Sequence, residues 1–381
     1  MRITITILFL SAFINSISAQ SVNSPGVEKI DSLVRTLISS KKSLGFMLGI
    51  KEQGKKPFFK EYGMTDLETK KAVTYNSEFR IASVTKPITA VAVMALIEKG
   101  KLKLSDTISK FISDFPNGDK ITIYQLLSHT SGIPNWSAGV LPKDAPNDFP
   151  MCKQPHLYLA TMKTTSFFEP GTKYSYSNSG FVILGEIIEI VSGMSYGDFL
   201  EKNIFAKANM QHTEVEYEPN ANENYVKGYR HSSPADTTFS NPDIYAMPFA
   251  AGCLRSNAAD MINFLDALYK GKLIKKSSLE LLTKYAATKN GVPVYDALFF
   301  PNNFTPPPPP SYLKKYDTGL GFDLMEVYNT PFVWHSGGIA GFNSILVYLP
   351  KSKTEIIFLS NTENGIIPIW QELQKEIVKF K

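Results

Sequence analysis

Apolar and polar positions form strand-like patterns near both ends of the chain. Near the N-terminus, apolar runs at residues 45–50 and 57–62 flank a short polar segment that contains a glycine. Near the C-terminus, apolar runs at 345–349 and 356–359 flank a second polar segment. Two apolar runs joined by a short polar turn are typical of a β-hairpin, so each end of the chain is predicted to contribute one hairpin.

Between these hairpins the pattern changes to helical spacing. Residues 87–99 are apolar nearly all round and are followed by Gly100, which predicts a buried helix with a defined end. Apolar residues between 181 and 191 also recur at helical spacing, and the chain closes with an amphipathic helical pattern over 369–378. No strand pair of comparable strength occurs in the middle of the chain.

These elements predict an α+β fold, in which an antiparallel sheet built from both chain ends is flanked by helices and packs against a mainly helical inserted lobe. We expect residues 20–100 and 250–381 to form the sheet lobe, and residues 101–249 to form the helical lobe with its loops. The chain of 381 residues is long enough for two lobes around one cleft. The helix near Ser83 would then lie at the junction and the strand with His335 on the sheet edge.

Residues 1–19 have the pattern of a cleavable signal peptide. A short basic start precedes the mostly apolar stretch 3–14, which is too short to span a bilayer. Small residues then lead to Ala19, which predicts cleavage after this residue and a periplasmic or secreted protein. No cysteine lies near this position and no later segment is long and apolar enough to cross a membrane, so we expect no stable membrane anchor.

Charge and composition narrow the expected partners. The formal net charge of +5 is spread along the chain, which does not favour a nucleic-acid partner. The five histidines lack metal-ligand spacing, so we expect no metal and no cofactor, and no protein partner is evident. Cys152 and Cys253 could form a bridge in an oxidising compartment, although two free or buried thiols are favoured. The expected partner is a small-molecule or peptide substrate.

A Ser-x-x-Lys pattern is the first candidate for catalytic chemistry, and it occurs three times. Ser39 lies in a polar junction and Ser311 follows five consecutive prolines, so only Ser83 opens a convincing helix. Ser83 and Lys86 are three residues apart and share one face of that helix. A helix N-terminus also favours developing negative charge. The alternative is a serine that caps the helix and a lysine in its first turn.

Two further segments can supply the remaining groups. The segment 176–178 places a phenolic proton carrier and an amide close together, although its composition also fits an ordinary polar turn. The segment 335–338 follows an apolar run and ends in two glycines, which allow the backbone to approach a ligand closely. A strand end followed by a flexible turn is the alternative here.

With these three segments in order, the chain resembles the serine beta-lactamase and penicillin-binding protein superfamily. The resemblance is to the branch of class C beta-lactamases, D-Ala-D-Ala carboxypeptidases and related esterases, whose motifs are S-x-x-K, Y-x-N and [KH]-[ST]-G. The flanking residues 79–82, 126–134 and 334–342 also fit, and the resemblance extends from about residue 30 to the C-terminus. It implies a beta-lactamase/transpeptidase-like fold.

The resemblance implies roles for individual residues. Ser83 would attack an acyl carbonyl, and Lys86 with Tyr176 would form the base system, with either one able to take the proton. The backbone N–H groups of Ser83 and Gly338 would form the oxyanion hole. Substrate contacts would come from Asn178, His335, Ser336 and Gly337.

One position departs from the commonest form of the third motif. Many members have lysine where this chain has His335, which is mostly neutral at pH 7 by its reference pKa. This weakens the case for a substrate with a free carboxylate. Arg255 could supply the missing charge, although a structural surface arginine is the favoured interpretation.

Two other features invite a functional interpretation. The sequence around Ser195 matches the G-x-S-x-G nucleophile elbow, but a helical pattern precedes it where the elbow needs a strand, so we expect a helix N-cap. His129 is expected to be a packing or loop-anchoring residue. The polar stretch 217–243 is predicted to be a loop over or beside the cleft, and the insertion 301–310 to shape its entrance.

These observations predict an exported serine hydrolase that acts through a covalent acyl-enzyme on amide or ester bonds. The substrate would be a D-amino-acid peptide, a small ester or a beta-lactam, and a carboxypeptidase or esterase is favoured over a dedicated beta-lactamase. The alternative is a penicillin-binding sensor or a catalytically silent binding relative.

Overall fold

The computed structural model describes residues 25–135, 166–217, 222–233, 236–239, 248–299 and 310–380. The predicted signal peptide, Cys152 and residues 301–309 of the proline-rich insertion lie outside the described residues, so the expectations that concern them stay predictions. The predicted lobe boundaries also stay predictions.

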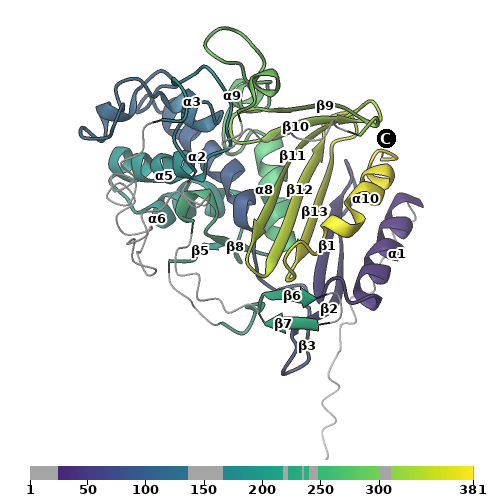
Figure 1. Cartoon of the computed structure of the whole chain (residues 1–381). Helices are drawn as coiled ribbons and strands as arrows, with labels where there is room; N and C mark the ends of the chain where they lie inside the picture. Colours follow the sequence, from purple (N-terminus) through teal and green to yellow (C-terminus); the bar gives the residue numbers. More distant parts are fainter. Residues whose placement is uncertain are drawn as a thin grey trace, which may run out of the picture.

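An antiparallel sheet of eight strands forms the centre of the protein, in the order β3-β2-β1-β13-β12-β11-β10-β9 (Figure 1). Its strands are β1 (Gly45–Lys51), β2 (Phe58–Asp66), β3 (Lys71–Ala72), β9 (Leu313–Thr318), β10 (Asp323–Val327), β11 (Thr330–Ile339), β12 (Phe342–Leu349) and β13 (Thr354–Ser360). Both predicted hairpins are present as β1–β2 and β12–β13. Strand β1 pairs with β13, which confirms that the two chain ends build one sheet.

Helices cover both faces of this sheet. Helices α1 (Pro25–Ser39) and α10 (Trp370–Ile377) pack together on one face, and α8 (Ala258–Tyr269) crosses β1 and β13 on the other (Figure 1). Alternate side chains of β13 therefore enter two separate cores: Phe358 packs toward α1 and α10, and Ile357 packs toward α8. Burial on both faces explains why the strand is an uninterrupted apolar run in the sequence.

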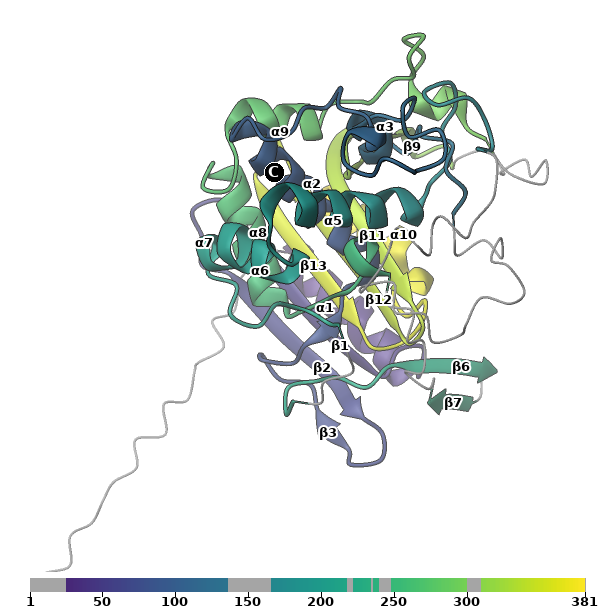
Figure 2. The same cartoon turned by 90° about the vertical axis from the view of Figure 1, so that its left-hand side faces the viewer.

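A mainly helical layer packs beside the sheet on the α8 side, with α2 and α5 in front of β11 to β13 (Figure 2). Its helices are α2 (Thr85–Glu98), α3 (Ile123–Leu127), α5 (Asn178–Ser192), α6 (Tyr196–Leu200), α7 (Ala206–Ala208) and α9 (Lys276–Leu282). Short helical turns are Ala82–Val84, Ile108–Lys110, Glu201–Phe205, Phe249–Ala251, Val294–Ala297 and, beside α10, Ile367–Ile369. Helix α2 is buried on nearly every side, as its all-round apolar pattern predicts.

Several strands do not follow from the sequence pattern. The short strands β4 (Phe79–Arg80), β5 (Glu214–Val215) and β8 (Leu254–Ser256) form a small sheet beside α2. Strands β6 (Tyr229–Ser233) and β7 (Asp236–Phe239) form a hairpin within the stretch predicted to be a loop, so that prediction is wrong there. Strand β9 was missed because it contains two consecutive exposed lysines in place of an apolar run, and lysines are common on edge strands.

No single described helix has the length and apolar composition needed to cross a membrane. Helix α5 and the segment Tyr196–Ala208 meet those criteria only as a pair, and the two are bent by 76° relative to each other.

Candidate active site

Ser83 lies in the 3₁₀ turn Ala82–Val84, between the short strand β4 and helix α2. The preceding Ala82 has φ 47°, a left-handed conformation that costs an alanine about 1–2 kcal/mol. The adjoining strand is held by Arg80, whose guanidinium forms two hydrogen bonds of 2.8 Å to the buried Glu216 carboxylate. Ser83 itself is partly exposed, although the flanking Ala82 and Val84 are buried. The turn therefore presents one hydroxyl from a rigid support.

Lys86 is fully buried one turn further along, and its amine meets three oxygens. Nζ lies 3.1 Å from Ser83 Oγ, and it donates to Asn178 Oδ1 at 2.6 Å and to the Ala251 carbonyl at 2.8 Å. Burial lowers the pKa of Lys86 well below its ordinary value, against the opposing effect of the Asp323 carboxylate. The site therefore favours an uncharged amine beside the Ser83 hydroxyl.

Tyr176 reaches the same hydroxyl from the segment that precedes α5. Its side chain is hydrogen-bonded to Ser83, and its ring centroid lies 4.8 Å from Lys86 Nζ. Burial raises the pKa of Tyr176 above its ordinary value, although the Ser83 hydrogen bond opposes this shift. The phenol therefore stays protonated at neutral pH and can donate a proton.

Asn178 is the first residue of α5, and Ser177 is the N-cap that accepts from the Gly180 N–H at 3.3 Å. This cap fixes the start of the helix and directs Asn178 Oδ1 toward Lys86. The second segment of the sequence is thus joined to the first by a hydrogen bond between side chains.

His335 approaches from strand β11, with its ring centroid 6.4 Å from that of Tyr176. Its Nδ1 lies 2.7 Å from the Ser336 carbonyl, and the side chain is buried. Burial, together with a smaller contribution from the nearby Lys86, lowers the pKa of His335 to about 3. The imidazole is therefore neutral at pH 7, so it cannot supply the fixed positive charge of a lysine.

Strand β11 is not the edge strand that the sequence analysis expects, because β10 and β9 lie beyond it. Strand β10 pairs only with the first half of β11, and the last paired residue is Trp334. From His335 onward, β11 instead contacts the turn that contains Ser83. The edge of β11 that faces β10 therefore lacks a paired strand only over the segment that carries the third motif.

Gly337 allows the two segments to meet. A Cβ atom at this position would lie 2.3 Å from the Ile81 carbonyl and 3.1 Å from the backbone nitrogen of Ser83. The structure thus shows a close approach of this glycine to the Ser83 turn, and its expected approach to a ligand stays a prediction. The next residue, Gly338, has open space around a Cβ position, and its place in the oxyanion hole stays a prediction.

Arg255 corrects one expectation. It is fully buried rather than on the surface, and it pairs with Glu78 at 3.3 Å and with Glu214. Its guanidinium also lies 4.9 Å from the centroid of the Tyr225 ring. These contacts account for Arg255 within the protein, so it is not available to a substrate carboxylate.

Ser195 behaves as predicted. It follows a helix rather than a strand, and its side chain accepts from the Asp198 N–H at 3.1 Å as the N-cap of α6. The nucleophile-elbow interpretation is therefore excluded.

Two contributors to the site were missed from the sequence. The Ala251 carbonyl that accepts from Lys86 belongs to the backbone, so no residue pattern indicates it. Asp323 is buried on β10, where Thr318 and Tyr316 hydrogen-bond to its carboxyl group, and burial raises its pKa to about 7. An acidic residue between the apolar Phe322 and Leu324 was the signal that could have drawn attention to it.

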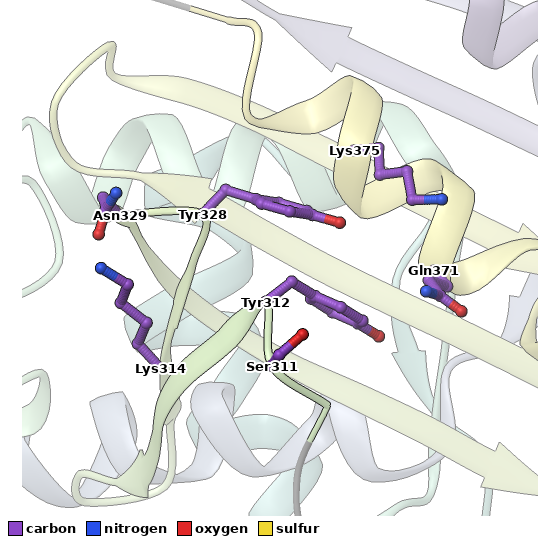
Figure 3. A pocket seen from close by; sticks show the side chains of 7 residues that line it. All are labelled: Ser311, Tyr312, Lys314, Tyr328, Asn329, Gln371 and Lys375. Carbon is purple, nitrogen blue, oxygen red and sulfur yellow. The ribbon is translucent and has the colours of Figure 1, made fainter.

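An open pocket of about 500 Å³ lies elsewhere, between α10 and the β9–β10 end of the sheet (Figure 3). Its lining residues are Ser311, Tyr312, Lys314, Tyr328, Asn329, Gln371 and Lys375. Figure 3 shows Lys314 extending toward Asn329 and away from Ser311, so this second Ser-x-x-Lys match forms no catalytic pair. None of the motif residues near Ser83 lines this pocket.

Comparison with known proteins agrees with the fold. Residues 30–367 match the Beta-lactamase family. The chain therefore belongs to this family and is related to its serine hydrolases.

Two curated relatives come from Bacillus subtilis (strain 168). Penicillin-binding protein 4* is 29% identical over 318 residues, which cover 79% of this chain and 64% of the relative. Putative penicillin-binding protein PbpX is 30% identical over 294 residues, which cover 76% of this chain and 63% of the relative. The chain thus spans less than two thirds of the length of either relative.

Two solved structures show the same fold. The D-amino acid amidase from Ochrobactrum anthropi SV3, complexed with L-phenylalanine amide, has a TM-score of 0.76 and 22% identity, covering 93% of this chain and 99% of that chain. A class C beta-lactamase mutant has a TM-score of 0.71 and 18% identity, covering 93% of this chain and 97% of that chain.

Proposed function

We propose that this protein is an exported serine hydrolase that cleaves amide or ester bonds through a covalent acyl-enzyme on Ser83. The observation that carries the proposal is the placement of Lys86 and Tyr176, which both contact the Ser83 side chain from different elements. A serine hydroxyl is a weak nucleophile unless a neighbouring base removes its proton. The signal-peptide pattern of residues 1–19 supports export to the periplasm or the medium.

Lys86 is the proposed base. Two of its oxygen partners, Asn178 Oδ1 and the Ala251 carbonyl, can only accept hydrogen bonds, and the third, Ser83 Oγ, can also donate. A neutral amine satisfies this set with two N–H donors and one lone pair directed at Ser83. The direction of the Lys86 pKa shift supports the same protonation state.

Acylation then proceeds with a balanced set of proton transfers. Ser83 Oγ forms a bond to the substrate carbonyl carbon as its proton moves to Lys86, and the carbonyl oxygen becomes an oxyanion. The backbone N–H groups of Ser83 and Gly338 are the proposed oxyanion donors, and one such donor contributes about 2.7–4 kcal/mol. Tyr176 gives its proton to the leaving nitrogen or oxygen as that bond breaks. The Lys86 proton then passes to Tyr176, and water hydrolyses the acyl-enzyme.

The proposed substrates are small esters and D-amino-acid amides or peptides without a free carboxylate beside the third motif. Asn178, Ser336 and Gly337 are proposed to contact the substrate with His335, which is neutral and cannot bind a carboxylate as a cation. The fold shared with a D-amino acid amidase supports the amide class.

The test compares three probes with wild type and with S83A: an ester reporter, a D-amino-acid amide and a fluorescent penicillin. We expect wild type to turn over at least the ester or the amide, and S83A to lose that activity together with the covalent adduct detected by mass spectrometry. Unchanged hydrolysis by S83A would overturn the nucleophile assignment. The names of the penicillin-binding relatives favour a sensor as the second candidate, for which a lasting penicillin adduct without turnover is expected.

A further inference from the structure

His129 lies just after α3, buried at 2% exposure, and adopts φ 57°. A left-handed conformation costs a non-glycine residue about 1–2 kcal/mol, so the contacts made there must offset it. The sequence predicts only a packing or loop-anchoring role for His129. Its contacts show what it anchors.

His129 holds the backbone on both sides of Tyr176. Its Nδ1 accepts a hydrogen bond from the Ser177 N–H at 3.1 Å, and its carbonyl accepts from the Ser175 N–H at 3.0 Å. Tyr176 is therefore placed between two residues whose amide groups are bonded to the same histidine.

The imidazole also packs against the Tyr176 side chain. The two ring centroids are 4.4 Å apart with the planes inclined by 32°, and the Phe181 ring lies 5.2 Å from the same imidazole. These distances are typical of aromatic contacts, which restrict the rotation of the tyrosine ring. The backbone and ring contacts together restrict the Tyr176 side chain to the orientation in which its hydroxyl meets Ser83.

We propose that His129 is a positioning residue, which fixes the Tyr176 hydroxyl at Ser83 through the Ser177 hydrogen bond and the ring contact. This inference rests on the proposed function, in which Tyr176 protonates the leaving group. His129 touches neither substrate nor Ser83 in this scheme, so its effect on the reaction is exerted entirely through Tyr176.

The hydrogen bond requires a neutral imidazole. Because Nδ1 accepts from Ser177, the ring proton of His129 is on Nε2. A second proton on Nδ1 would face the Ser177 N–H, so two donors would oppose each other. Burial and the nearby Lys86 and His335 lower the pKa of His129 well below its ordinary value, which keeps the acceptor available.

The test uses two substrates with one acyl group and different leaving groups, a p-nitrophenyl ester and an alkyl amide. A p-nitrophenolate needs little protonation, whereas an amine must be protonated to leave. In H129F, which keeps an aromatic ring but lacks the acceptor, kcat/KM for the amide should fall by about 10- to 100-fold, within the range of general acid catalysis. For the p-nitrophenyl ester it should fall by less than about threefold. H129N, whose Oδ1 replaces Nδ1 as acceptor but which lacks the ring, should restore the part of the amide activity that depends on the Ser177 hydrogen bond.

A double-mutant cycle with Y176F distinguishes positioning from general support. H129F combined with Y176F should be no slower on the amide than Y176F alone, because Y176F already removes the proton donor that H129F would misplace. Equal losses for both substrates in H129F, or full additivity with Y176F, would overturn the inference. If H129F does not fold, as judged by circular dichroism and thermal unfolding, H129Q replaces it in the test. The glutamine side chain is one bond longer than asparagine, so its oxygen is displaced from the position of Nδ1. S83A is measured alongside: residual activity there defeats the proposed function, whereas an inactive S83A without the leaving-group effect defeats only the role of His129.

Discussion

Two buried basic side chains flank Ser83, and they differ in the charge of their partners. Arg80 precedes the Ser83 turn and pairs with the buried carboxylate of Glu216 through two hydrogen bonds. Lys86 follows the turn, and its hydrogen-bond partners are neutral oxygens. The two side chains are close in the sequence and both are buried, so the charge of their partners distinguishes them.

The pKa shifts follow from this difference. Burial alone lowers the pKa of Arg80, but the Glu216 carboxylate more than offsets it, and the net shift is upward. For Lys86 burial dominates and the net shift is strongly downward, because Asp323 opposes it only in part. A buried cation with a bonded carboxylate is a structural element, whereas a buried amine without one is poised to exchange a proton.

The largest expected effect is the loss of catalysis in K86M. Methionine fills a similar volume without an amine, so Ser83 loses its proposed base, and kcat/KM for an ester reporter should fall by about 10⁴-fold. Thermal unfolding should show a smaller loss of stability than a broken buried ion pair, because the change leaves two acceptors without their donor but leaves no charge buried. A K86M protein that kept wild-type activity, or lost stability as severely as a broken ion pair, would contradict the comparison.

The matched substitution before the Ser83 turn is R80M, which should lower the stability of the fold. It leaves the Glu216 carboxylate buried without its partner, and breaking a buried pair in this way costs about 3–5 kcal/mol. Urea unfolding monitored by fluorescence measures this cost. The double variant R80M/E216L should recover most of it, and failure to recover would show that Arg80 acts through contacts other than the ion pair.

A helix or strand of this fold could be predicted where its own residues carry a clear apolar pattern. The hairpins and α2 were predictable because burial on two faces or all round produces long apolar runs, as in β13 and α2. Strand β9 was not, since its lysines face solvent at a sheet edge. Strands such as β4 are two residues long and exist only through pairing with β8, which lies far away in the sequence.

The site shows the same division. Ser83, Lys86 and Tyr176 were predictable because the side chains themselves carry the chemistry in recognisable motifs. The Ala251 carbonyl and the β10 register that opens the strand edge after Trp334 are properties of the folded backbone. His129 was noted in its segment, but only the folded chain brings its Nδ1 to the N–H that follows Tyr176.

A smaller effect is expected from Asp323, whose charge acts on Lys86 at a distance. Burial raises the pKa of Asp323 to about 7, and its ionised form raises the pKa of Lys86. D323N removes that charge, so the Lys86 amine should stay neutral to lower pH, and the acidic limb of the kcat/KM profile should move down by about one pH unit or less. His335 should add no limb between pH 5 and 8, because its pKa lies at about 3. A limb that moved upward in D323N would contradict the assignment of Lys86 as the base.

The smallest expected effect concerns Glu355, a buried carboxylate whose cationic partner is present but not close. Lys51 Nζ lies 3.9 Å from its Oε2, and that oxygen has no hydrogen bond within the described part of the chain. Burial raises the pKa of Glu355 to about 8, despite the opposing charge of Lys51. The folded state then binds a proton that the unfolded state releases near pH 4.5, so stability is lost as the pH rises from there toward 8.

E355Q should remove this contribution to the pH dependence. At pH 9 the variant is expected to be more stable than wild type by about 1–3 kcal/mol, since an amide needs no proton to remain buried. Urea unfolding of both proteins at pH 5 and pH 9 measures the difference, which should be small at pH 5, where both side chains are uncharged. Equal stabilities at pH 9 would mean that Lys51, 3.9 Å away, compensates the charge of Glu355 as well as the hydrogen-bonded Glu216 carboxylate compensates the charge of Arg80. The difference between Arg80 and Lys86 would then depend on the presence of a counter-charge and not on the hydrogen bonds that it makes.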